Sequence, residues 1–194
     1  MDFILKIDHK IFYYLNSQFT NSAFDWFFPL WTNIHKNKIF MAIFIPLVLW
    51  WCFKKWRAKG GVVFILACLL TAGADVVVGF LKPLFDRLRP VHSNLPFEVV
   101  LRGSPQGGLS FPSGHATDAF FLATFLAVFY PQGRKCFYIL AFLTAYSRVY
   151  CGVHYPSDVL CGSILGIVLG LIAGYSVRLL YKTYIFKKQA TKGT

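Results

Sequence analysis

The stretch VVFILACLLTAGADVVVGFL, residues 62–81, carries a single charged side chain, Asp75, in 20 positions. A helix needs about 20 mainly apolar residues to cross about 30 Å of hydrocarbon, so this stretch is long enough to span a membrane. A surface helix of a soluble protein normally shows a polar stripe, which this stretch lacks. Further apolar runs lie at 39–52, 119–130, 136–146 and 159–180. The sequence therefore predicts an all-α fold, a bundle of helices that cross the membrane several times.

The composition of the 194-residue chain agrees with this interpretation. Hydrophobic residues make up 56% of it and charged residues only 14%, whereas a soluble domain averages about 25% charged residues. The net charge of +12 would suggest nucleic acid in a soluble protein. Here the basic residues flank apolar runs, where membrane topology and anionic lipid account for them. We therefore expect a lipid bilayer as the partner and no nucleic acid.

The apolar runs predict how the single domain is organised. Residues 2–19 have amphipathic helical spacing and suit the membrane interface. The segment 21–33 is aromatic-rich but short, so we expect it to be interfacial or re-entrant, with a sixth span as the alternative. The domain divides into an interfacial segment 1–37, a helical core 38–184 and a basic tail 185–194. We predict five transmembrane helices at 38–53, 61–82, 113–130, 136–150 and 157–180, with tight loops at 54–59 and 131–135 and one long loop at 87–111.

Basic residues predict the orientation of these helices. The stretches 54–59 and 134–135 and the C-terminal tail share one side of the membrane, which is cytoplasmic by the positive-inside rule. The other side is also basic. The difference in basic charge between the two sides becomes larger when Lys82, Arg89 and Arg148 are set aside as functional charges. The loop 87–111 and the region 147–158 then face the exterior. A small chain of this kind suits the cytoplasmic (inner) membrane of a bacterium, with its site facing the periplasm or exterior.

Three short segments on the exterior side, 82–90, 112–115 and 147–158, concentrate the polar chemistry. Lys82 and Arg148 each close a predicted span, and Arg89 lies seven residues after Lys82. Cations at such depth are costly unless they are paired, and few carboxylates lie nearby. Arginine binds phosphate through two parallel hydrogen bonds, and lysine binds it as a point charge. The surplus of cations therefore predicts a site for a phosphate anion.

The segment 112–115 has the pattern of a helix start. Ser113 suits the N-cap position, and Gly114 allows a close approach to the backbone. The free N–H groups at the start of a helix bind phosphate well. His115 lies in the first turn, beside a phosphate bound there.

The second histidine, His154, precedes a helix that we expect to begin at Pro156, a residue favoured at the first helical position. Asp158 lies four residues after His154. A carboxylate that accepts the imidazole N–H fixes the tautomer and leaves the other ring nitrogen as a nucleophile. One histidine can then attack phosphorus while the other protonates the leaving oxygen.

These three segments resemble the signature of the type 2 phosphatidic acid phosphatase family over roughly residues 60–175. The shared pattern is Lys-x6-Arg-Pro, Pro-Ser-Gly-His and Ser-Arg-x5-His-x3-Asp, without departure in residue type or spacing. The resemblance implies a helical membrane bundle, a phosphohistidine at His154, a general acid at His115 and Asp158 as the partner of His154. It implies no metal and no other cofactor. It also implies a phosphate cradle made of five residues: Lys82, Arg89, Ser113, Gly114 and Arg148.

The expected function is metal-independent hydrolysis of a lipid phosphate or pyrophosphate on the exterior face, which makes the protein a phosphoric monoester or diphosphate hydrolase. Undecaprenyl pyrophosphate ranks first among the substrates. Phosphatidylglycerol phosphate, phosphatidic acid and the 1-phosphate of lipid A are the alternatives. Two other classes stay open, a lipid phosphotransferase and a non-catalytic lipid-binding or scaffolding protein.

Simpler interpretations exist for several of these residues. Lys82 and Arg89 could extend from the interface into water. Asp118, one turn after His115, could orient that histidine or pair with a cation. The surrounding cations disfavour a divalent metal, although a zinc site can be drawn from four side chains: His115, Cys151, His154 and Asp158.

Overall fold

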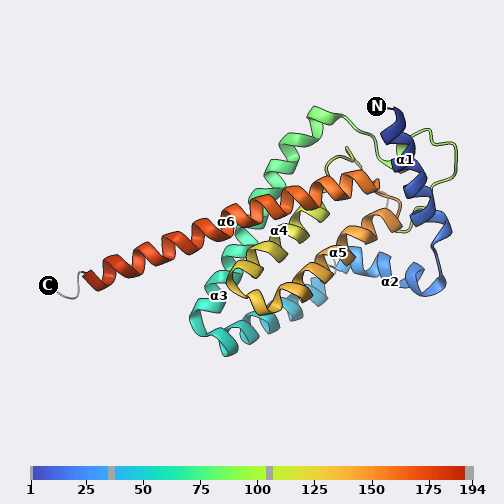
Figure 1. Ribbon diagram of the computed structural model, residues 1–194. Helices are drawn as coiled ribbons and strands as arrows, with labels where there is room; N and C mark the ends of the chain where they lie inside the picture. The colour runs from blue at the N-terminus through green and yellow to red at the C-terminus, as the bar shows by residue number, and fades with distance from the viewer. Residues whose placement is uncertain (1, 35–37, 104–106, 191–194) are drawn as a thin grey trace.

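The computed structural model describes residues 2–34, 38–103 and 107–190, and every regular element in these ranges is helical. The predicted all-α fold is therefore confirmed. Figure 1 shows α4, α5 and α6 side by side, with α1 and α2 near the end at which α6 begins. The helices are α1 (Asp2–Tyr13), the π-helical turn η1 (Tyr14–Gln18), α2 (Ser22–Asn33), α3 (Lys38–Phe85), η3 (Pro90–His92), α4 (Gly114–Phe129), η4 (Pro131–Gly133), α5 (Arg134–Tyr150) and α6 (Pro156–Ala190).

Two of the described stretches, Gly61–His92 and Pro156–Thr183, are long and apolar enough to cross a membrane. The apolar helix α4 is shorter, with 16 residues. A soluble protein rarely exposes a large continuous apolar surface, so exposed hydrophobic side chains along a helix suit contact with lipid. The count of five spans stays a prediction. Large exposed hydrophobic side chains follow both α3 and α6: Leu69, Val76, Phe80, Leu160, Ile172 and Leu179.

The predicted loop at 54–59 is wrong, because these residues continue the helix α3. The stretch holds Lys, Arg, Ala and Trp without proline or glycine, and Lys, Arg and Ala are good helix formers. Figure 1 shows that α3 nevertheless does not run straight, since its ribbon turns back between the cyan and teal parts. Near the C-terminus, α6 continues to Ala190, so the first part of the tail predicted at 185–194 is helical. Residues 191–194 lie outside the described residues.

Close contact between α4 and α6 fixes the geometry of the site. A Cβ atom on Gly166 would lie 2.2 Å from the carbonyl oxygen of Thr117, and one on Gly162 would lie 2.6 Å from that of Ser113. Only glycine, which has no Cβ atom, permits this approach. Small residues allow the same close contact between membrane helices in general. The backbone N–H of Ser113 donates to the carbonyl of Asp158 over 3.1 Å. The start of α4 is thereby held against the start of α6.

The N-terminal helices cover the end of the bundle where α5 gives way to α6. Phe12 of α1 is fully buried and packs with Val149 and Tyr155. Phe28 of α2 packs with Tyr150 and its neighbours. The N-terminal helix predicted within 2–19 is therefore present, and residues 22–33 form a second helix, α2. Their place at the membrane interface stays a prediction.

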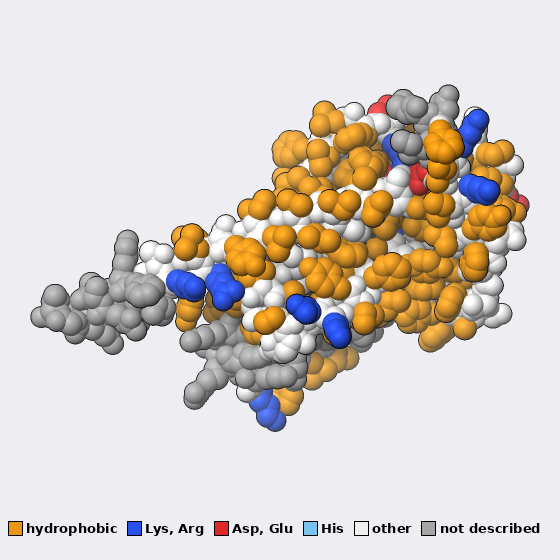
Figure 2. Space-filling model, viewed as in Figure 1, with side chains coloured by type: hydrophobic (Ala, Val, Ile, Leu, Met, Phe, Trp, Pro, Cys, Tyr) orange, Lys and Arg blue, Asp and Glu red, His pale blue; other side chains and the backbone are white. Residues whose placement is uncertain are grey.

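Basic side chains lie at both ends of the molecule, and at the covered end Lys6 and Lys10 of α1 are exposed. Figure 2 shows Lys and Arg over the turn between α4 and α5 and along the outer part of α6, with hydrophobic side chains over most of the flank between. Arg134, Lys135 and Lys182 are exposed. Lys36 and the side chains of 55–60 lie outside what the structure describes.

Candidate active site

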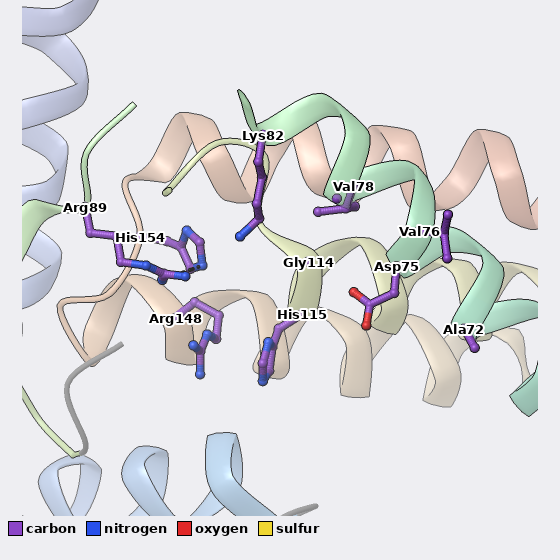
Figure 3. Close-up of a pocket in the computed structure, with 11 residues that line it drawn as sticks. Ala72, Asp75, Val76, Val78, Lys82, Arg89, Gly114, His115, Arg148 and His154 are labelled. Carbon is purple, nitrogen blue, oxygen red and sulfur yellow. Dashed lines mark hydrogen bonds between the residues drawn. The ribbon is translucent and has the colours of Figure 1, made fainter. Parts of the chain in front are cut away.

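A cavity of about 550 Å³ opens where α3, α4 and the α5–α6 connection meet (Figure 3). Three cations and one carboxylate line it, which gives a net charge of +2 with neutral histidines. Such a surplus in a partly buried cavity favours an anion. The lining residues are Ala72, Asp75, Val76, Val78, Gly79, Lys82, Arg89, Gly114, His115, Arg148 and His154.

Backbone carbonyls of the long loop hold two of the cations. Lys82, at the end of α3, donates to the carbonyl of Leu109 over 3.0 Å. Arg89 is buried, with 6% of its surface exposed, and donates to the carbonyls of Gly107 and Val153. Neutral acceptors orient these side chains without cancelling their charge. Both cations therefore stay available to an anion in the cavity.

Arg148, at the end of α5, has a buried hydrogen-bond donor that no described residue accepts from. Its NH1 group donates to the hydroxyl of Thr32 in α2 over 2.5 Å. Its buried Nε atom and the buried hydroxyl of Ser113 have no hydrogen-bond partner among the described residues. Buried polar groups are rarely left unpaired, so these two donors point to a ligand that accepts hydrogen bonds.

His154 lies between Arg89 and a carboxylate. Its Nε2 atom is 3.1 Å from NH1 of Arg89, and its Nδ1 atom is 3.4 Å from Oδ2 of Asp158. Burial lowers the pKa of His154 from its ordinary 6.5 to about 4, against the opposing effect of Asp158. The ring is therefore neutral at physiological pH. With its proton on Nδ1, the lone pair of Nε2 faces Arg89 and the cavity.

Three more groups hold Asp158, and none of them was predicted from the sequence. Its Oδ2 atom accepts from the hydroxyl of Ser110 and from the backbone N–H of Tyr155. Its Oδ1 atom accepts from NH1 of Arg87 over 2.6 Å. Arg87 stands within the first of the three segments, which was the only signal for it in the sequence.

His115 and Gly114, in the first turn of α4, line the same cavity as Asp75 of α3. Figure 3 shows the Asp75 carboxylate directed toward this turn. Asp118 has one carboxylate oxygen buried without a hydrogen-bond partner among the described residues. Both interpretations of Asp118 stay predictions.

The structure thus brings the predicted residues of all three segments together. Six of them line the cavity, while Ser113 and Asp158 adjoin it through Gly114 and His154. Within the described residues, no three His, Cys, Asp or Glu side chains are grouped so that they could hold a metal ion. The donor set that a zinc site needs is therefore not assembled there.

Comparison with known proteins agrees with this geometry. Residues 61–182 match the family model of the PAP2 superfamily. The chain belongs to this superfamily. The predicted resemblance and the predicted class, a membrane lipid phosphatase, are confirmed.

Several relatives match the chain over most of its length. The lipid A 4'-phosphatase of Bacteroides thetaiotaomicron is 32% identical over 86% of this chain and 75% of its own. The lipid A 4'-phosphatase of Porphyromonas gingivalis is 30% identical over 100% of this chain and 79% of its own. The crystal structure of Aquifex aeolicus LpxE is 30% identical, with a TM-score of 0.63 over 84% of this chain and 92% of that one.

Proposed function

We propose that the protein hydrolyses a phosphate monoester of a membrane lipid, without a metal ion, through a phosphohistidine at His154. The observation that carries this proposal is the combination of a neutral, buried His154 with unpaired donors at the edge of a cationic cavity. An anion site alone needs no such histidine. A phosphatase needs both a nucleophile and a cradle for the phosphoryl oxygens.

The chemistry takes two steps. Nε2 of His154 attacks phosphorus, the bond from phosphorus to the lipid oxygen breaks, and His115 donates a proton to that oxygen. Water then attacks the phosphohistidine, the phosphorus–nitrogen bond breaks, and His115 takes a proton from the water. Inorganic phosphate and the lipid alcohol leave. Lys82, Arg89 and Arg148 stabilise the charge on the phosphoryl oxygens in both steps.

The wall of the cavity suits a lipid. Ala72, Val76 and Gly79 belong to the part of α3 that is apolar enough to cross a membrane. Val76 is 58% exposed, so this wall continues onto the outer surface of the helix. An acyl chain can lie along that face while its phosphate enters the cationic part of the cavity.

We place a lipid A phosphomonoester first among the substrates and undecaprenyl pyrophosphate second. The support for this order is the similarity to two lipid A 4'-phosphatases over 86% and 100% of the chain. We also propose that the site faces the periplasm or exterior, because the basic turn between α4 and α5 lies at the far ends of these helices from the site.

The test is phosphate release by the purified protein in detergent with excess EDTA. The substrates are lipid A, undecaprenyl pyrophosphate, phosphatidylglycerol phosphate and phosphatidic acid, each with His154→Ala as the control. Release from lipid A that survives EDTA and is lost in the variant supports the proposal. Release that needs added metal contradicts the mechanism, and preference for another lipid contradicts the substrate order. Transfer to an added alcohol in place of water would favour the phosphotransferase.

A further inference from the structure

The Arg87 guanidinium lies between two carboxylates that are far apart in the chain. Its NH1 group is 2.6 Å from Oδ1 of Asp158, and its NH2 group is 2.6 Å from Oδ2 of Asp8 in α1. The side chain of Asp158 is fully buried, and only 6% of that of Asp8 is exposed. Arg87 therefore supplies a cation that pairs with both of these buried carboxylates.

Arg87 has little freedom to turn. Its guanidinium carbon lies 4.0 Å from the centre of the Tyr155 ring, so the planar group is stacked as well as hydrogen-bonded. Its NH1 group also donates to the hydroxyl of Ser157. Its backbone carbonyl accepts from the N–H of Ser110, whose hydroxyl bonds to Asp158. Both oxygens of Asp158 are thus oriented by groups tied to Arg87.

Asp8 completes this arrangement from α1. It accepts the backbone N–H of Ser157 over 2.9 Å and the hydroxyl of the same residue over 2.6 Å. These bonds join α1 to the first turn of α6, one residue before Asp158. Asp8 therefore holds both Arg87 and the turn that carries Asp158.

We propose that Arg87 is a positioning residue for the His154–Asp158 pair and that Asp8 acts through Arg87. Asp158 turns one oxygen to His154 and the other to Arg87. Loss of Arg87 removes the partner of Oδ1 and leaves the carboxylate held through Oδ2 alone. This inference rests on the proposed function of His154. For histidines that bind metal ions, replacing the partner that orients the ring commonly costs about 10- to 100-fold in activity, and we expect a similar loss here.

The chain offers a matched control in Arg102 and Asp25. Their side chains are also 2.6 Å apart, and the Arg102 guanidinium also lies over a tyrosine ring, at 4.5 Å from the centre of Tyr150. The hydrogen bonds of Arg102 go to Asp25 and to the backbone carbonyls of Asn16 and Tyr150. The side chain of Asp25 is 47% exposed and that of Asp158 is buried, so Arg102→Gln controls for loss of the ring contact and of one cation, and Arg87→Lys, which keeps the cation, controls for the unpaired buried carboxylate.

The experiment measures kcat and KM for lipid phosphate hydrolysis by Arg87→Gln, Arg87→Lys and Arg102→Gln. We expect Arg87→Gln to lower kcat by about 10- to 100-fold with KM changed less than about threefold. Arg87→Lys should recover part of the loss because it keeps the charge. Arg102→Gln should change kcat by less than about threefold. Equal losses in kcat for Arg87→Gln and Arg102→Gln would overturn the proposal.

A double variant tests the role of Asp8. Asp8→Asn alone should lower kcat by about 3- to 10-fold and should add little to Arg87→Gln, because Asn keeps an acceptor for the Ser157 N–H and the charge that is lost is the one paired with Arg87. Independent, additive losses would overturn that part of the proposal. The acid limb of the kcat–pH profile should also move to higher pH in Arg87→Gln and stay in place in Arg102→Gln. The groups around Asp158 that bear on this limb are Lys82, Arg87, Arg89, His154, Tyr155 and Cys161.

His154→Ala separates the two proposals. If it keeps normal turnover, the proposed function fails, and the positioning proposal fails with it. If it loses turnover while Arg87→Gln keeps the kcat of the wild type, only the positioning proposal fails.

Discussion

Nε2 of His154 lies 3.1 Å from NH1 of Arg89, which joins the proposed nucleophile directly to the phosphate cradle. The carbonyls of Gly107 and Val153 hold Arg89 in place, so the contact belongs to a fixed frame. In the proposed mechanism, a phosphate oxygen that binds Arg89 lies next to the nitrogen that attacks phosphorus. Binding and alignment for attack are consequences of one contact.

The buried His154 predicts a dependence of stability on pH. Its pKa is about 4 in the folded protein and 6.5 without burial, so between these values the unfolded chain binds a proton that the folded chain does not. The free energy of unfolding therefore falls as the pH is lowered through this window. Thermal unfolding in detergent should show this loss in the wild type and a smaller one in His154→Gln. Equal losses in the two proteins would contradict the prediction.

Arg148 should not be replaceable by lysine. Lysine keeps the charge but loses the Nε donor and the bond to Thr32, so we expect kcat/KM to fall by about 10- to 100-fold. Thr32→Val should cost less, because the guanidinium remains and only its support is lost. Thr144→Val, which removes a hydroxyl bonded to Trp31 away from the cavity, is the control. A wild-type kcat/KM in Arg148→Lys would rule out this role of the guanidinium.

His115 should matter most when the leaving group is poor. If it protonates the leaving oxygen, His115→Ala should lower kcat/KM for an alkyl phosphate by about 10²- to 10⁴-fold. The loss with p-nitrophenyl phosphate should be at least about tenfold smaller, because that leaving group needs little protonation. The ratio of the two losses is the measurement. The same loss with both substrates would show that His115 is not the general acid.

The contact between α4 and α6 also predicts an effect on stability. A Cβ atom on Gly166 meets the backbone of α4 at 2.2 Å, so Gly166→Ala should lower the free energy of unfolding by about 1–3 kcal/mol. A Cβ atom on Gly73 meets nothing within 4 Å, so Gly73→Ala in α3 serves as the control. Thermal unfolding checks both variants. A stable Gly166→Ala protein would mean that the two helices are not held at this distance.

The sequence predicted those site residues that stand in compact local patterns. Pro112 to His115 marked the start of α4, and Pro156 marked the start of α6, because helix ends have local chemical requirements. Asp8 escaped prediction because its partner Arg87 lies 79 positions away and an acidic residue on an amphipathic helix looks solvated. Thr32 and Arg148 are separated by 116 positions. Pairs of this kind follow from tertiary packing, which no local pattern encodes.

The prediction of a loop at 54–59 was wrong for a local reason. Its charged residues suggested an exposed connection, but most of them also favour helix, and the backbone stays helical through a turn of α3. Charge predicts where a chain meets water and does not by itself break a helix.

The central claim is that phosphate passes through a covalent bond to His154, and the stereochemical course at phosphorus tests it most directly. The substrate is a lipid thiophosphate made chiral with oxygen isotopes, hydrolysed in isotopically labelled water. Attack by His154 and then by water inverts phosphorus twice, so the account predicts retention of configuration in the released thiophosphate. Inversion would show a single direct attack by water and would contradict the account.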